Sequence, residues 1–263
     1  MNGRDVESLY LAGVLAGLFA VAMLYSSVGH GGASGYLAVL SLTAYAGMES
    51  DWLRQHAWSL NLVVAGIAFW HYRRAGHHVA GLTLPFIAAS IPLAMLGGTF
   101  RVEGVMYDTL LSLTLVLAAW RLLSSVGGEM VTEQTLVPEL RTSLPIGGGI
   151  GLVSGVVGIG GGIFLSPIVM LKGWASPKTT AATAALFVWA NSAAGLVGAG
   201  ISGRLLLDLD TLALFAVAVV IGGMVGARYG AVRAPPMIIR RLLVGVLLIA
   251  AARRVLDMMG IWL

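Results

Sequence analysis

The sequence contains no cysteine, so disulfide bonds and thiolate chemistry are excluded for this chain. Charge is also scarce, because Asp, Glu, Lys and Arg make up only 11% of the 263 residues while 58% are hydrophobic. This composition is typical of an integral membrane protein. The opening residues, MNGRDVES, lack the basic cluster of a cleaved signal peptide, so we expect the first hydrophobic segment to be retained.

Long stretches without charge recur along the chain, and about 20 apolar residues are enough to cross a bilayer. The two longest run from Ser8 to Met48 and from Thr142 to Leu171. The basic residues are spread over the loops, which argues against a nucleic-acid partner and for the lipid bilayer. We predict an all-α, multi-pass protein of the cytoplasmic membrane, whose shorter and weaker spans cover 55–72, 75–100, 105–123, 179–203, 211–227 and 237–255.

Two tryptophans fit a single span of this kind. Trp52 and Trp70 are 18 residues apart, or about 27 Å of helix. Tryptophan is enriched at both membrane–water interfaces. We expect the two side chains to anchor the ends of one helix.

One glycine-rich motif occurs twice. The segment SVGHGGAS (27–34) resembles part of GVVGIGGGIFLSP (155–167), with Gly29 and Gly158 separated by 129 positions. Asn61 and Asn191 follow at nearly the same separation. We therefore predict two similar halves, 1–124 and 143–263, each made of one interrupted segment and three ordinary spans, joined by a polar linker at 125–142.

The consecutive glycines predict helix breaks. Gly160, Gly161 and Gly162 would destabilise a helix by about 2–3 kcal/mol, and they do not share one helix face. A break at membrane depth is tolerated only where the backbone faces protein or a water-filled cavity. By contrast, the four-residue spacing of Gly222, Gly226 and Gly230 predicts close helix packing.

The interrupted segments allow two topologies. If each crosses the membrane fully, the chain crosses eight times and the repeats are parallel. If each turns back at mid-depth, the halves cross three times each and the repeats are inverted. Cytoplasmic loops are enriched in Lys and Arg, so a correct topology should place most basic residues on one face. The eight-crossing arrangement divides the 16 basic residues evenly between the two faces and gives no such signal. The second places ten on one face, so we favour inverted repeats with re-entrant hairpins and both termini outside; the ten are Arg73, Arg74, Arg121, Arg141, Lys172, Lys178, Arg228, Arg233, Arg240 and Arg241.

A helix that begins after a break presents unpaired N–H groups and the positive end of its dipole, which together form an anion site. Two such helices are expected, starting near Ala33 and Ile163. The predicted substrate-binding residues are Gly29, His30, Gly31, Gly32, Ala33, Ser34, Asn61, Gly158, Gly160, Gly161, Gly162, Ile163, Ser166 and Asn191. No catalytic residue, cofactor or metal ligand is predicted.

Each polar side chain in this set has a second interpretation. Ser34 and Ser166 either donate to a bound oxyanion or bond the carbonyl four residues earlier. Asn61 and Asn191 either contact the substrate or bridge the broken backbone. His30 either adds charge and couples transport to protons, or bonds free carbonyls within the break.

The chain resembles the sulfite exporter TauE/SafE family of membrane transporters. The resemblance rests on the duplicated motif, above all GVVGIGGGIFLSPIVMLKGWASPKTTAATAALFV, and on the two four-segment halves. The first motif departs from the usual pattern, with His30 in the break and Ala38 where Pro167 would align. The resemblance implies movement of a small sulfur-containing anion, such as sulfite, a sulfonate or sulfoacetate, across the cytoplasmic membrane.

The functions left open are a secondary transporter, which we favour, a passive anion channel and a membrane enzyme. The sequence has no His-x-x-x-His with a nearby acid, no Gly-x-Ser-x-Gly and no ATP-binding motif. We therefore expect a protein that is not an enzyme and is driven by an ion gradient, protons included, or by the substrate gradient. A homodimer stays open.

Overall fold

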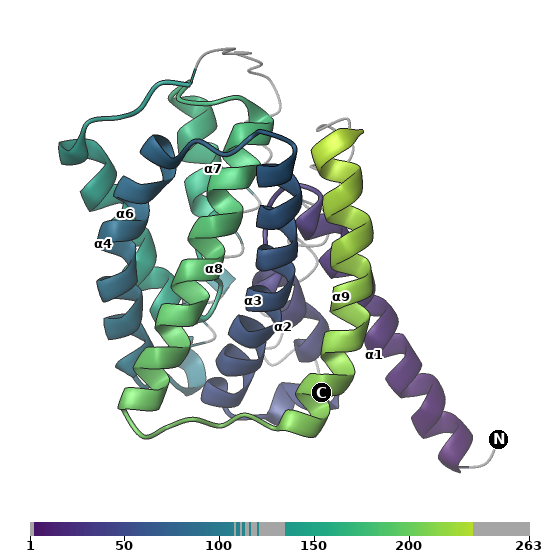
Figure 1. The fold of residues 1–263 in the computed structure, drawn as a ribbon. Coiled ribbons are helices and arrows are strands. Elements are labelled where there is room, and N and C mark those ends of the chain that lie inside the picture. The colour runs from purple at the N-terminus through teal and green to yellow at the C-terminus, as the bar shows by residue number, and fades with distance from the viewer. Residues whose placement is uncertain are drawn as a thin grey trace.

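The computed structural model describes residues 3–107, six positions between 109 and 120, and residues 135–233. The predicted span 237–255 and most of the linker 125–142 lie outside the described residues. The helices are α1 (Gly3–Ser26), α2 (Ala33–Ser41), the 3₁₀ helix η1 (Ala44–Gly47), α3 (Ser50–Arg74), α4 (Ala80–Thr99), α6 (Leu140–Val157), α7 (Gly162–Leu171), α8 (Pro177–Ile201) and α9 (Leu209–Val232) (Figure 1).

The predicted all-α membrane fold is confirmed. Five helices, α1, α4, α6, α8 and α9, are long and apolar enough to span a membrane. Helix α3 has the same 25-residue length as α8, about 37 Å, but it is not among the five. Its first turns carry Asp51, Arg54, Gln55 and His56, which lower its mean hydropathy.

Helices α3 and α8 run antiparallel through the centre of the bundle (Figure 1). Trp58 of α3 packs on Gly195 of α8, and the side chains of Asn61 and Ser192 are hydrogen-bonded. Helix α8 begins with Ser176 as its N-cap, followed by proline at the first helical position, which is a favourable start for a helix. This antiparallel pair holds both asparagines of the predicted site.

Glycines allow helices of the two halves to pack closely against each other. At Gly222, Gly226 and Gly230 of α9 an added Cβ would overlap the backbone of α1 or of Ser27 directly after it, which confirms these glycines as packing positions. The same holds where α6 crosses α4, at Gly147, Gly151 and Gly155. Helix α9 of the second half therefore lies on α1 of the first, and α4 of the first half lies on α6 of the second.

Both predicted helix breaks are present, and the chain reverses direction at each. After the first break α2 returns along α1, so that the Ala44 N–H meets the Tyr10 hydroxyl near the start of α1. After the second, the Leu136 N–H donates to the Trp174 carbonyl at 2.7 Å, which joins the approach to α6 with the end of α7. The two hairpins open toward opposite ends of the bundle (Figure 1). Their arrangement across a membrane as inverted repeats stays a prediction.

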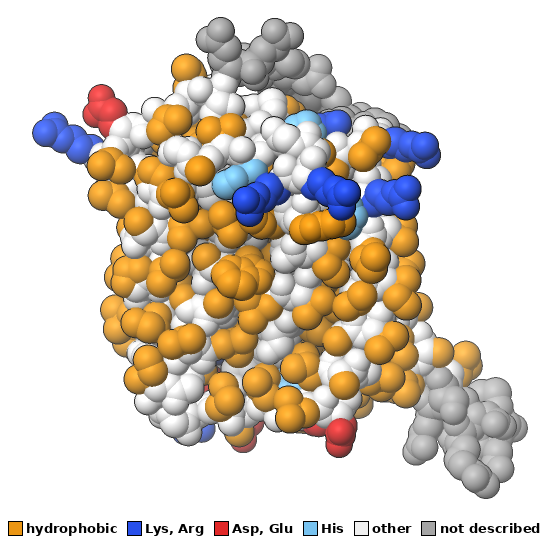
Figure 2. Space-filling model, viewed as in Figure 1, with side chains coloured by type: hydrophobic (Ala, Val, Ile, Leu, Met, Phe, Trp, Pro, Cys, Tyr) orange, Lys and Arg blue, Asp and Glu red, His pale blue; other side chains and the backbone are white. Residues whose placement is uncertain are grey.

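The two ends of the bundle carry opposite charge (Figure 2). The basic end comprises the ends of α3 and α9 and the starts of α4, α6 and α8, while the acidic end comprises the starts of α3 and α9 and the ends of α4 and α8. At the basic end, burial and the nearby Lys178 lower the pKa of His77. At the acidic end, hydrogen bonds from Thr211 lower the pKa of Asp208, whose carboxylate caps α9.

One predicted interfacial anchor is wrong. Trp70 is 53% exposed near the end of α3, but Trp52 is only 6% exposed. The Trp52 ring stacks between Tyr45 and His56, with ring centroids 5.5 and 3.7 Å away. The 3₁₀ helix before α3 folds over Trp52, which spacing along a single helix could not reveal.

Candidate functional site

Both breaks end in a glycine whose backbone is in the left-handed region. Gly32, the N-cap of α2, has φ 103°, and Gly161, the N-cap of α7, has φ 83°. Residues with a Cβ rarely adopt such angles. Neither N-cap provides a side-chain hydrogen bond to its helix. The first N–H groups of α2 and α7 are therefore left for other acceptors.

The breaks meet at the α3–α8 pair. An added Cβ would touch the Asn61 amide group at either Gly31 or Gly160, and it would lie 2.9 Å from Val188 at both positions. At Gly162 it would lie 3.0 Å from the His30 ring. Residues from the two halves, 129 positions apart, thus lie around the same two side chains of α3 and α8.

The outer glycine of each motif has a packing role instead. An added Cβ at Gly29 would overlap the backbone of Ala181 in α8, and one at Gly158 would lie 2.9 Å from the Arg54 side chain of α3. Each break therefore rests on the long central helix of the other half. Gly29 and Gly158 face these helices rather than the meeting point of the breaks.

The two asparagines bond their own breaks with opposite polarity. The Ala33 N–H donates to Asn61 Oδ1 at 2.9 Å, so Asn61 provides the acceptor that the first helix start needs. Asn191 Nδ2 donates to the Gly160 carbonyl at 3.3 Å. Because the backbone partners are a fixed donor and a fixed acceptor, they determine the orientation of both amides. Both side chains are fully buried and tie the broken backbone to α3 and α8.

His30 and Ser166 join the two halves at the site. His30 Nδ1 lies 2.9 Å from the Val28 carbonyl, and Nε2 lies 3.2 Å from Ser166 Oγ. A carbonyl can only accept, so Nδ1 carries the proton and Nε2 of the neutral ring accepts from the Ser166 hydroxyl. Protonation of Nε2 would reverse that bond and leave the hydroxyl proton free for another acceptor.

The Ser34 side chain bonds a core tyrosine. Its hydroxyl is 2.8 Å from the hydroxyl of Tyr25, which lies in a hydrophobic core formed by residues of both halves. Ala33 and Ile163 are buried in that same hydrophobic core. The structure therefore gathers His30, Gly31, Asn61, Gly160, Gly162 and Ser166 at one point, while the Ser34 hydroxyl bonds Tyr25.

Other residues at this point were missed from the sequence. Val188 lines both breaks, Ser192 bonds Asn61 at 3.2 Å, and the Tyr36 hydroxyl donates to the Gly31 carbonyl at 2.7 Å. The position of Ser192 beside Asn191 was the available signal. Among the described residues, two buried atoms nearby have no hydrogen-bond partner, Asn191 Oδ1 and Ser154 Oγ, the latter lying against Gly161.

The site is enclosed in this structure. His30 is 5% exposed, Ser166 is 7% exposed and both asparagines are fully buried. The surrounding groups are amide N–H groups, hydroxyls, carboxamides and one imidazole. This set can stabilise a small anion by hydrogen bonds without a fixed cation.

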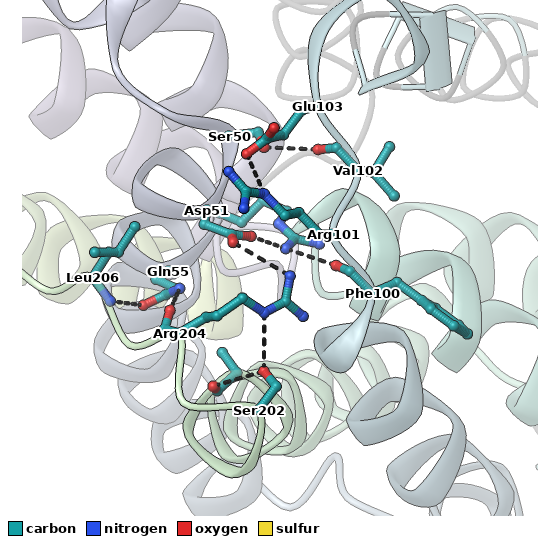
Figure 3. A network of polar contacts seen from close by, with 12 residues as sticks. Ser50, Asp51, Gln55, Phe100, Arg101, Val102, Glu103, Ser202, Arg204 and Leu206 are labelled. Carbon is teal, nitrogen blue, oxygen red and sulfur yellow. Dashed lines mark hydrogen bonds and ion pairs between the residues drawn. The ribbon is translucent and has the colours of Figure 1, made fainter.

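A second polar cluster closes the acidic end (Figure 3). We call it the acidic-end network. Its centre is Asp51, which pairs with Arg54 of the same helix and with Arg204 after α8, at 3.6 Å. Arg54 is 1% exposed, and its guanidinium donates to the carbonyls of Val156 at 2.7 Å and Phe100 at 3.1 Å.

The same network ties α3 to the chain that follows α8. Gln55 donates to the Arg204 carbonyl at 2.7 Å and accepts from the Leu206 N–H at 2.6 Å. Arg204 also donates to the Thr99 carbonyl at the end of α4. Residues of the two halves are thus joined by several polar contacts at this end.

The profile of the family described as sulfite exporter TauE/SafE matches residues 13–254. The chain belongs to this family. A probable membrane transporter protein, y4hK of Sinorhizobium fredii (strain NBRC 101917 / NGR234), is 34% identical over 229 residues, which cover 86% of this chain and 90% of that protein. No solved structure matches the chain. The resemblance inferred from the duplicated motif is therefore confirmed, and the protein is a multi-pass membrane transporter of the TauE/SafE family.

Proposed function

We propose that the protein is a secondary transporter that carries a small sulfur-containing oxyanion, of the sulfite, sulfonate or sulfoacetate class, across the cytoplasmic membrane. The observation that carries the proposal is that two helix starts with glycine N-caps, those of α2 and α7, meet at Asn61 and Val188. The family description supports the substrate class. The anion accepts hydrogen bonds from backbone N–H groups of both breaks and from the Ser166 hydroxyl.

Electrostatics supports a site built from backbone. A fixed arginine at mid-depth of a bilayer costs about 3 kcal/mol or more, while each helix N-terminus supplies roughly half a positive charge. Two such helix ends replace part of the hydration of an anion without binding it too tightly to release. Protonation of His30 would add a full charge and free the Ser166 hydroxyl, which provides a route for proton coupling.

The enclosed state favours a transporter over a passive channel. The site residues are buried, and the acidic-end network joins the halves between the site and the acidic end. Substrate access then requires the contacts of at least one end to open. A channel would need a continuous path in a single conformation.

Counterflow in proteoliposomes tests this function. Vesicles loaded with unlabelled sulfite and diluted into a trace of labelled sulfite should accumulate label transiently, and empty vesicles should not. A panel of sulfonates and sulfoacetate, with chloride and phosphate as comparison anions, gives the substrate class. Flux without counterflow would show a channel, and a protein that moves none of the sulfur anions would refute the proposal.

Replacement of Ser166 by alanine tests the site itself. We expect sulfite binding to weaken by about tenfold, because one hydrogen bond to a charged group is lost. Ser143→Ala is the matched control, since Ser143 is also a buried helix serine but donates to the Glu139 carbonyl four residues earlier, at 3.2 Å. Equal affinities for the two variants would place the anion away from Ser166.

A further inference from the structure

A cavity of about 760 Å³ lies between the last turns of α3 and α9, at the basic end. Its lining includes Trp70, His71 and Arg74 from α3 and Met224, Val225 and Arg228 from α9. It opens on the outer surface of the bundle and shares no residue with the meeting point of the breaks. Figure 2 shows Lys and Arg side chains gathered over this end of the molecule, above a broad hydrophobic belt.

The two arginines of the cavity have no carboxylate partner in the part of the chain that the structure describes. The ion pairs found there, formed by Asp51 with Arg54 and Arg204 and by Arg101 with Glu103, are all at the acidic end. The Arg74 guanidinium lies over the Trp70 ring, 5.2 Å from its centroid. Among the described residues, the two positive charges of the cavity therefore have no neutralising acid.

The lining changes from polar to apolar along the helices. Arg74 is the last residue of α3, and Trp70 lies one turn before it, 53% exposed. On α9, Arg228 lies one turn before the helix end, and Met224 and Val225, 53% and 50% exposed, come one turn earlier. Tryptophan and arginine at such a position are typical of the membrane–water interface, with apolar side chains facing the acyl chains.

We propose that this cavity binds the headgroup of an anionic phospholipid. The lipid phosphate accepts hydrogen bonds from Arg74 and Arg228, and the first carbons of an acyl chain lie along Met224 and Val225. Basic pockets between membrane helices bind anionic headgroups by this combination of charge and apolar surface. A soluble anion would use the arginines but gain nothing from the apolar wall, which is why a lipid fits better.

The test compares lipids by their effect on the melting temperature of the purified full-length protein and by native mass spectrometry. Phosphatidylglycerol should stabilise the protein and remain bound at levels where phosphatidylcholine does not. In Arg74→Gln/Arg228→Gln the apparent affinity for phosphatidylglycerol should fall by about tenfold to thirtyfold. Both side chains are exposed, so the variant should keep its fold without added lipid.

Three controls make the result decisive. Arg73→Gln/Arg233→Gln removes two exposed charges from the same helix ends but outside the lining, and it should keep the selectivity. Arg74→Lys/Arg228→Lys keeps the charge and should retain most of the selectivity for phosphatidylglycerol. Inorganic phosphate or glycerol phosphate should not replace the lipid. Three results would each overturn the proposal. They are an equal loss of phosphatidylglycerol affinity in the two double Gln variants, unchanged selectivity in Arg74→Gln/Arg228→Gln, and full stabilisation by free phosphate.

Discussion

Asn61 and Asn191 are equivalent in sequence but opposite in hydrogen bonding. Asn61 accepts the Ala33 N–H, whereas Asn191 donates to the Gly160 carbonyl. Aspartate is close to asparagine in shape, but when ionised it can only accept. The same replacement should therefore have different effects at the two positions.

Asn61→Asp should keep most of the stability, because a carboxylate can accept from both the Ala33 N–H and the Ser192 hydroxyl. Asn191→Asp should lower stability further, by about 1–3 kcal/mol, since a carboxylate oxygen would face the Gly160 carbonyl without a proton between them. Sulfite binding should be lost in Asn61→Asp because of charge repulsion. Thermal melting and binding of the purified variants measure both effects.

Two results would contradict this assignment. If Asn61→Asp melts below Asn191→Asp, the acceptor role of Asn61 is wrong. If Asn61→Asp binds sulfite as well as the unmodified protein, the anion does not lie beside this side chain. The double variant should show both defects, since the two amides bond different breaks.

At the scale of elements, α3 and α8 are equivalent helices of the two halves, but their first turns carry different residue types. The asparagines align at a separation of 130, and at that separation Asp51, Arg54 and Gln55 align with three alanines: Ala181, Ala184 and Ala185. The alanines of α8 allow Gly29 to approach its backbone, while the polar residues of α3 form the acidic-end network. Among the described residues, the buried charge pairs therefore lie at one end of the site.

Loss of Arg204 should make the site more accessible from the acidic end. Arg204 is partly exposed, and its side chain joins the two halves through Asp51 and the Thr99 carbonyl. The bond from Gln55 to the Arg204 backbone carbonyl remains in the variant. A contribution of about 1 kcal/mol to the closed state would make opening roughly fivefold more frequent in Arg204→Gln. Because the chain has no native cysteine, Ser192→Cys provides a single reporter thiol at the site.

The measurement is the rate at which a membrane-impermeant reagent modifies that thiol from the acidic-end side. Arg101→Gln is the control, because Arg101 pairs with Glu103 on the same end but through an exposed pair, 61% and 44% exposed. It should leave the rate unchanged. An Arg204→Gln rate equal to that of the control would mean that the network does not close the site.

The sequence predicted the helix breaks but not their neighbours, for a physical reason. Consecutive glycines oppose a helix wherever they occur, so Gly158–Gly162 indicates a break from local energetics alone. The spacing of Gly222, Gly226 and Gly230 likewise indicates a helix face, or notch, where another helix packs closely. Which helix fills the notch depends on tertiary packing between segments about 200 residues apart, such as α1 and α9, and no local pattern carries that information.

The positive-inside rule treats every arginine as a loop residue. Arg54 is instead buried in α3 and bonded to Asp51 and two carbonyls. The spacing of Asp51 and Arg54, three residues apart on one helix, was the available signal for an internal pair. With Arg54 removed from the count, the contrast between the two faces becomes larger.

At the scale of the whole molecule, this contrast predicts sidedness. Among the described residues, Arg73, Arg74, Arg141, Lys172, Lys178, Arg228 and Arg233 lie toward the basic end, where Glu139 is the acid. Lys and Arg favour the cytoplasmic side of a membrane protein. The basic end should therefore face the cytoplasm, with the acidic-end network on the outer side.

Single cysteines in the otherwise cysteine-free chain test this orientation. Lys172→Cys and Arg233→Cys, at the basic end, should resist an impermeant thiol reagent added to intact cells and react after the membrane is permeabilised. Glu103→Cys and Asp210→Cys, at the acidic end, should react in both conditions. A cysteine in the linker 125–142 should behave like Lys172→Cys, because that linker leads into the start of α6 at the basic end. Labelling of the linker cysteine and Arg233→Cys from opposite sides would mean that the second broken segment crosses the membrane fully. A hairpin that turns back keeps the linker and the end of α7 on one face, and α8 and α9 together return the chain to that face.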